Sequence, residues 1–274
     1  MATTDPPDSP GSTNHSEIAH SSVTTDKSVD LDAIRDRLDH VHDPELDRSI
    51  VELQYVEAIE IDDGAVTVAF VLPTAWCSPA FAWMMATGIR DEVEVVSGVT
   101  SVTVRLSDHM HGDEITTGVN QRRSFDSVFE DAEDGIMAVQ QKLDEKARFA
   151  RQHSAIKALQ QGGLDPDQIA PLTRADIELD FSSDLAAVTV QDGALTVTVA
   201  RDPLAEYLNK ARETGLVADE SDRLFADREG EPLASDPESF ESIVRDARLA
   251  AANIEGQGAI CESLHESRNG VHFD

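Results

Sequence analysis

A cysteine at the expected start of a helix is the residue of this sequence best suited to chemistry. Cys77 follows Thr74 and precedes Pro79, a residue type favoured in the first turn of a helix. The free backbone N–H groups of a helix start carry partial positive charge, which favours the thiolate. The sequence therefore predicts that Cys77 is a nucleophile or a soft-metal ligand. The alternative is a small apolar residue buried beside Trp76, as most free cysteines are.

Two carboxylates precede this cysteine in a short Asp-Pro-Glu motif. Asp43 and Glu45 flank a proline where a helix is expected to end. Carboxylates in such a place act as acid/base groups or bind hard metals. A turn that caps the following segment is an equal alternative.

His109 and His111 are candidate metal ligands at the end of an expected strand. Residues i and i+2 of a strand share one face, so both imidazoles could converge on a metal ion. Two histidines beside an aspartate fall short of a complete site, and a polar loop is the alternative.

A thiol and an imidazole also lie four residues apart near the end of the chain. Cys261 and His265 would be neighbours on a helix. Because the chain has only two cysteines, we hypothesise that this pair folds back to join Cys77 and the loop 108–111 around a metal or cluster. A Cys-x3-His spacing also arises by chance.

The elements expected around Cys77 describe a small α/β domain. Apolar residues recur at helical spacing and then alternate, and Asp-Asp-Gly between two alternating runs predicts a hairpin. The resulting order is helix, strand, strand, helix, strand, over residues 31–41, 56–61, 65–72, 79–93 and 99–106. We expect the helices to pack on the short sheet.

The rest of the chain predicts a long helix and a second, smaller α+β domain. The helix covers 125–159 and stops at two glycines. Beyond it we expect a hairpin at 186–199, a helix at 202–214, a loop at 218–236 and a last helix at 237–253, with glycines at 256 and 258 breaking the chain direction. The fold class is α/β (α+β). The predicted divisions are a disordered tail at 1–27, a first domain at 28–122, a helical connector at 123–163 and a second domain at 164–274.

The composition limits the partners. The chain has 53 acidic and 22 basic residues, for a net charge of -31, so it would repel nucleic acid and anionic membranes. The acids are scattered, which favours a solvated surface adapted to a high-salt, halophilic cytoplasm over one cationic binding face. No apolar run approaches the roughly 18 residues that span a bilayer. We expect a cytoplasmic protein without a disulfide framework.

The ordered motifs resemble a known family over about residues 30–108. They are Asp43-Pro44-Glu45, Leu53-Gln54-Tyr55-Val56, Thr74 and Cys77 before a helix, and Gly98-Val99 before the last strand. This set is similar to the family once catalogued as domain of unknown function 59, which includes the PaaD and SufT proteins and eukaryotic cytosolic iron-sulfur assembly factors. The family usually has Gly where this chain has Gln54, and Pro directly after the cysteine where Ser78 stands here.

The resemblance implies an iron-sulfur cluster assembly or maturation factor. It would be a carrier or adaptor rather than an enzyme, and would deliver a transiently bound cluster to client metalloproteins with the help of other assembly proteins. Cys77 would bind the cluster, with Asp43, Glu45 and Thr74 around it, and the protein could form homo-oligomers. One alternative is a metal-free scaffold for the maturation of a metalloenzyme such as a monooxygenase. Another is a thiol enzyme with a histidine held against Cys77.

Overall fold

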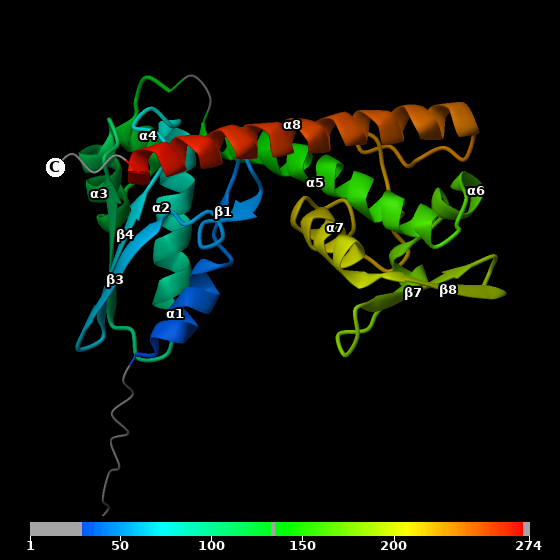
Figure 1. The fold of residues 1–274 in the computed structure, drawn as a ribbon, viewed down its shortest axis with the longest axis horizontal. Helices are drawn as coiled ribbons and strands as arrows, with labels where there is room; N and C mark the ends of the chain where they lie inside the picture. Colours follow the sequence, from blue (N-terminus) through cyan, green and yellow to red (C-terminus); the bar gives the residue numbers. More distant parts are fainter. Residues whose placement is uncertain (1–28, 133–134, 271–274) are drawn as a thin grey trace, which may run out of the picture.

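The protein is built as two α+β units joined by two long helices that lie side by side (Figure 1). The computed structural model describes residues 29–132 and 135–270. The predicted tail at 1–27 lies outside the described residues. Each unit has its own buried core, and the mixed composition confirms the α+β class.

The first unit holds a three-stranded sheet in the order β3-β4-β5. Strands β3 and β4 are antiparallel, whereas β4 and β5 are parallel, with Ala65 opposite Ser101. The predicted helix-strand-strand-helix-strand order is present. The elements in chain order are α1 (Leu31–Leu38), β1 (His42–Asp43), β2 (Arg48–Ser49), β3 (Val56–Asp62), β4 (Ala65–Val71), α2 (Pro79–Glu94), β5 (Ser101–Ser107), α3 (Gly112–Asn120) and α4 (Phe125–Val128).

Local chemistry explains where these elements begin and turn. The Asp30 carboxylate caps α1 by accepting a hydrogen bond from the Asp32 amide at 3.0 Å. The β3–β4 turn places Asp63 and Gly64 at φ angles of 43° and 84°, as a tight hairpin turn requires. Gln54 also has a positive φ, 58°, a backbone conformation that favours glycine.

Helix α3 was not predicted, and it covers the outer edge of strand β5. The Asn120 side chain donates to the Val104 carbonyl at 2.8 Å and accepts from the Val104 amide at 2.9 Å. The Thr116 hydroxyl accepts from the Leu106 amide at 3.1 Å. These side chains bond to the backbone groups at the edge of β5 that a neighbouring strand would otherwise pair with.

The expected continuous helix over 125–159 is wrong, because the chain forms α4 and then α5 (Ile136–Gln161). Phe125 and Phe129 pack against each other and against Trp83, with ring centroids 4.9 to 6.2 Å apart. This aromatic packing holds α4 against α2. The helix is therefore interrupted after α4, and α5 extends separately toward the second unit.

The second unit also follows the predicted order and adds a third strand. Strands β6, β7 and β8 form an antiparallel sheet, and the β7–β8 turn has Gln191, Asp192 and Gly193 all at positive φ. Its elements are α6 (Pro166–Ile169), a 3-10 turn η1 (Arg174–Asp176), β6 (Ile177–Leu179), β7 (Leu185–Val190), β8 (Leu195–Ala200) and α7 (Arg201–Glu213).

The last helix, α8 (Pro237–Gly270), is longer than predicted and connects both units. The expected break at Gly256 and Gly258 is wrong, since both glycines are helical. Phe240 lies in the core of the second unit, whereas Cys261 packs on the core of the first. This packing at both ends offsets the roughly 1 kcal/mol that each helical glycine costs. Of the helices described, none is both long and apolar enough to cross a membrane.

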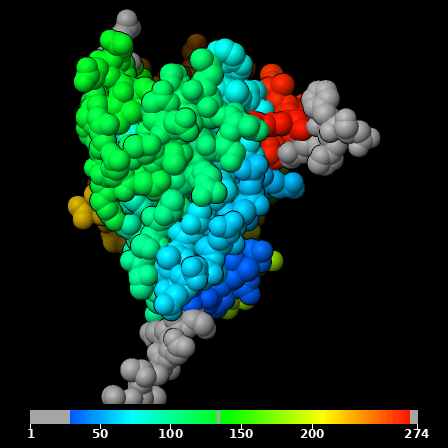
Figure 2. Space-filling view, turned by 90° about the vertical axis from the view of Figure 1, so that its left-hand side faces the viewer, coloured from blue at the N-terminus to red at the C-terminus, as the bar shows by residue number. Residues whose placement is uncertain are grey.

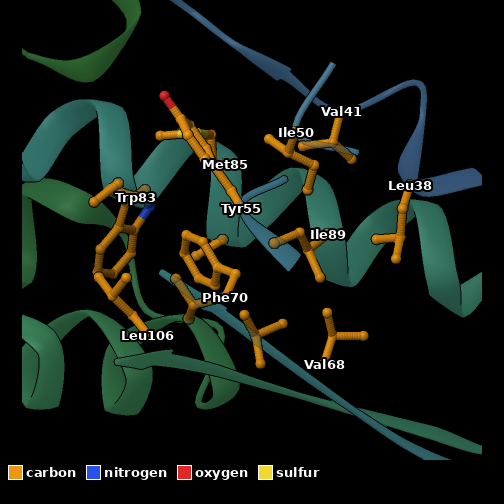
Figure 3. Packing of buried hydrophobic residues seen from close by; sticks show 14 of the residues in the cluster. Leu38, Val41, Ile50, Tyr55, Val68, Phe70, Trp83, Met85, Ile89 and Leu106 are labelled. Carbon is orange, nitrogen blue, oxygen red and sulfur yellow. The ribbon is translucent and has the colours of Figure 1, made fainter. Parts of the chain in front are cut away.

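The core of the first unit lies between α2 and the sheet (Figure 3). Tyr55, Phe70, Met85 and Ile89 are each under 2 % exposed. In Figure 3 the Tyr55 hydroxyl points away from Phe70. The ring therefore contributes to the core, while the hydroxyl is free to take part in a polar site at its margin.

Two helical glycines give a matched stability test of this packing. A Cβ on Gly118 would lie 2.6 Å from the Trp83 ring and 3.0 Å from Val128, whereas one on Gly256 would meet nothing within 4 Å. We expect Gly118→Ala to lower the free energy of unfolding by about 2 kcal/mol through overpacking. We expect Gly256→Ala to raise it by about 0.5–1 kcal/mol. Urea denaturation measures both, and equal effects would contradict the packing around Trp83.

Candidate functional site

Cys77 lies in the loop that joins β4 to α2, two residues before α2 begins at Pro79. Its side chain is half-buried, and its Sγ is 3.5 Å from the Thr74 hydroxyl oxygen. That oxygen accepts a hydrogen bond from the Trp76 amide at 3.2 Å, so the hydroxyl proton is available to the sulfur. A thiolate at Cys77 would thus have a hydrogen-bond donor already in place. The neighbouring Trp76 is 77 % exposed and does not bury the cysteine.

His109 holds the backbone of Cys77 instead of its sulfur. Its Nδ1 accepts from the His111 amide at 3.1 Å, which leaves Nε2 to carry the proton and donate to the Cys77 carbonyl at 2.9 Å. Burial lowers the pKa of His109, which agrees with a neutral ring. Both histidines follow the end of β5, so the predicted common strand face is wrong. Binding a metal through His109 would require breaking one of these hydrogen bonds.

His111 lines a cavity of mixed apolar and acidic character next to the start of α2. Its ring packs edge-on to Phe129 with centroids 5.4 Å apart, and its Nδ1 is 3.8 Å from the Glu114 carboxylate. The cavity has a volume of about 730 Å³ and is also lined by Ser78 and Pro79. The His109 and His111 rings lie 6.2 Å apart, centroid to centroid, but their ring nitrogens have different partners.

Asp43 is a buried turn residue with one oxygen directed to a polar site. It is 8 % exposed, and its Oδ1 accepts from the amides of Glu45 and Leu46 at 2.9 and 3.1 Å. The turn interpretation of the motif is thus observed. Its Oδ2 accepts from the Tyr55 hydroxyl at 3.4 Å. Burial raises the pKa of Asp43, and burial together with the Asp43 charge raises the pKa of Tyr55.

The carboxy-terminal part of α8 lies against this motif, although more than two hundred residues separate them in sequence. Figure 2 shows this end of the chain, in red, against the first unit. The Gln257 side chain donates to the Glu45 carboxylate at 3.1 Å. The His265 ring is 7 % exposed and lies 5.7 Å from the Tyr55 ring, centroid to centroid. The end of the chain is therefore part of the same site.

Cys261 lies on this end of α8, and its sulfur is close to the groups around Cys77. Both cysteines are half-buried and pack against the core of the first unit. Burial, and then the charges of Asp43, Cys77 and Glu45, raise the pKa of Cys261 to about 11. The predicted return of Cys261 and His265 to the first unit is thus present in the structure. Metal binding by Cys261 and His265 stays a prediction.

The predicted ligands do not form one complete metal site. Within residues 29–132 and 135–270, no three or more His, Cys, Asp or Glu side chains are grouped so as to hold a metal ion. Asp43, Cys77 and Glu45 all contribute to the raised pKa of Cys261, and the His265 ring lies against Tyr55, which bonds Asp43. His109 and His111 are held by other partners.

Three residues of the site were not predicted from sequence, namely Tyr55, Gln257 and Arg268. The Arg268 guanidinium donates to the Leu72 carbonyl, at the start of the loop that holds Cys77. Tyr55 lies inside a motif that carries the resemblance, but only its hydroxyl contact to Asp43 shows its part in the site. Gln257 and Arg268 share one helical face with Cys261, a spacing that a helix predicted to reach residue 268 would have shown.

Comparison with known proteins gives one family match, which lies within the first unit. Residues 31–104 match the family described as iron-sulfur cluster assembly protein. The match contains the Asp43 motif, Tyr55, Thr74 and Cys77, and it ends before α3. A comparison with curated proteins found no match to this chain.

Proposed function

Because residues 31–104 match the family described as iron-sulfur cluster assembly protein, we propose that this protein carries a cluster on Cys77 and delivers it to client proteins. The family match supports a general role in cluster assembly, and the position of Cys77 supports the carrier role. Its half-buried thiol next to a hydroxyl donor suits a thiolate ligand for iron. The cluster would be cargo and not a permanent cofactor.

The surface around Cys77 favours contact with another protein. Trp76 is 77 % exposed and Met110 is 54 % exposed. The Met110 amide donates to the Ala75 carbonyl at 3.0 Å, which fixes these two apolar side chains on neighbouring segments. Aromatic and methionine side chains are enriched in protein interfaces. A client or an assembly protein could bind here beside the thiol.

A carrier agrees better with the histidine arrangement than a thiol enzyme does. A catalytic cysteine needs a base that can take its proton. His109 donates to the Cys77 carbonyl oxygen and accepts from the His111 amide, so neither of its ring nitrogens is available for the sulfur. The ligand set found among the described residues is incomplete, which also suits release, because a cluster held by few ligands can pass to a partner that supplies more.

The test is to load the full chain with ferric iron, a thiol reductant and sulfide, without oxygen and in high salt. After desalting, we expect iron and acid-labile sulfide to remain with the protein in stoichiometric amounts. We also expect transfer to an apo-ferredoxin that a chelator for free iron does not prevent. The chelator is the control that separates direct transfer from release into solution.

Two results would overturn the carrier proposal. Zinc alone in the purified protein would favour a structural or hydrolytic metal site. No iron and no sulfide after loading would favour the metal-free scaffold, which would bind a client or assembly protein through the Trp76 surface.

A further inference from the structure

We propose that Cys261 is a second thiol ligand of the Cys77 site, so that the cargo is held between the first unit and the end of α8. This inference rests on the proposed function and deepens it. It assigns a role to a segment that lies outside the residues matched by the family.

Helix α8 is built to reach the site. It spans 34 residues, which at 1.5 Å per residue is about 50 Å. It begins on the second unit, where Phe240 is buried, and packs its middle on α5 through Ala247 and Ala250. Its last turns lie on the first unit (Figures 1 and 2). The far end of the helix is thus positioned by packing along its whole length.

One face of this helix end is directed at the site. The face carries Gln257, Cys261, His265 and Arg268, at the i, i+4, i+8 and i+11 positions of one helical stripe. We call these four residues the α8 stripe.

The two residues on either side of Cys261 in the α8 stripe both contact the first unit. Gln257 donates to Glu45 at 3.1 Å and accepts from Lys146 at 2.9 Å. His265 lies against the Tyr55 ring at 5.7 Å. Cys261 lies between these contacts, so its side chain must also point toward the first unit.

Arg268 fixes the end of the stripe next to the Cys77 loop. Its guanidinium donates to the Leu72 carbonyl at 2.6 Å and pairs with the Asp108 carboxylate at 2.7 Å. Leu72 is the first residue of the loop that holds Cys77. Asp108 directly precedes His109, whose ring bonds the Cys77 carbonyl. Arg268 therefore ties the helix to both segments that position the first thiol.

Cys261 and Cys77 pack against the same core, and the Cys77 charge contributes to the raised pKa of Cys261. Tyr55 is buried in that core, and His265, four residues from Cys261 on α8, lies against its ring. Each thiol would lose its proton on binding a soft metal, as metal thiolates require. Iron-sulfur clusters usually take four ligands. Two thiols from this chain would leave the other positions for the acceptor, which allows transfer by ligand exchange.

The test uses cobalt(II) alone as the probe, so that it does not depend on cluster loading. Thiolate-to-cobalt absorbance is measured for the full chain, for Cys77→Ser and for Cys261→Ser. The matched control adds Ser263→Cys to Cys261→Ser, because Ser263 is exposed two residues along α8 and restores the thiol count on the outer face. We expect each single variant and the control to show about half of the wild-type absorbance or less, since one of two thiolate ligands is missing.

Each outcome decides the inference separately from the proposed function. Wild-type absorbance in Cys261→Ser, or full recovery when Ser263→Cys is added, would overturn the role of Cys261. Absence of thiolate-to-cobalt absorbance in the wild type would overturn it too. The proposed function is judged by iron and sulfide loading, so a chain that loads and transfers a cluster without Cys261 keeps that function and loses only this inference.

Discussion

Cys77→Ser is expected to lower the iron and sulfide retained after loading about tenfold or more, and to abolish transfer to an acceptor. Serine has nearly the same size as cysteine. Its hydroxyl, however, is a hard and weakly acidic ligand that binds iron much less well than a thiolate does. The side chain is half-buried and contacts Thr74, so serine can keep the local hydrogen bond. The fold should therefore persist while the ligand is lost.

The control for this variant keeps the number of thiols constant. Ser101 lies at the exposed start of β5, away from the Cys77 loop, so Ser101→Cys added to Cys77→Ser restores a thiol outside the site. We expect this double variant to behave like Cys77→Ser. Recovery of iron and sulfide in it would mean that any exposed thiol collects iron, and would contradict a specific role for Cys77.

The elements of the first unit were predictable because their signals are local. The β3–β4 hairpin depends on Asp63 and Gly64, whose positive φ angles follow from the residue types themselves. The start of α1 depends on the Asp30 cap, and the start of α2 on Pro79. Each of these signals lies within a few residues of the structure that it determines.

Helix α3 and the true length of α8 depend on contacts that the local sequence does not contain. In α3, the Asn120 and Thr116 side chains bond to backbone groups of β5. The type of a polar residue does not reveal which backbone group it will bond to. In α8, the low helix propensity of Gly256 disfavours a helix locally. The packing of α8 on two separate units outweighs this low propensity.

The site shows the same division. The return of Cys261 was predictable as a hypothesis because the chain has so few thiols, whereas the role of His109 was not. His109 bonds to the backbone carbonyl of Cys77, and every residue has such a carbonyl. A pair of histidines in sequence therefore indicates metal ligands and backbone supports equally well.

Asp47 connects the motif loop of the first unit to the second unit through buried charges. Its side chain is 10 % exposed and bonds to the Arg151 guanidinium of α5. The Lys210 ammonium of α7 lies 3.7 Å from the same carboxylate, and the His42 ring lies 3.6 Å from it. Burial alone would raise the pKa of Asp47, but the His42 hydrogen bond and the two cationic charges hold it below its ordinary value.

Asp47→Asn is expected to lower the free energy of unfolding by about 3 kcal/mol at neutral pH. Asparagine tolerates the positive φ of 54° at this position, so the backbone is kept and only the charge is removed. Arg151 is 19 % exposed and Lys210 is 11 % exposed, so each would keep a largely buried charge without this carboxylate. Lys210 retains Asp144 and Glu213, and the cost therefore falls mainly on Arg151.

The pH dependence identifies this mechanism. A carboxyl whose folded pKa is lowered stabilises the fold above its unfolded pKa, and that stabilisation is lost as the pH falls through the folded pKa. The difference between wild type and Asp47→Asn should be constant above about pH 5 and should shrink below about pH 4. The control is Asp184→Asn. Asp184 pairs with Arg201 but is 98 % exposed, so this variant should change the free energy of unfolding by less than about 1 kcal/mol.

Urea denaturation at fixed salt from pH 7 to pH 3 measures the wild type and both variants. Equal losses in the two variants at neutral pH would show that the contact between the units does not depend on buried charge.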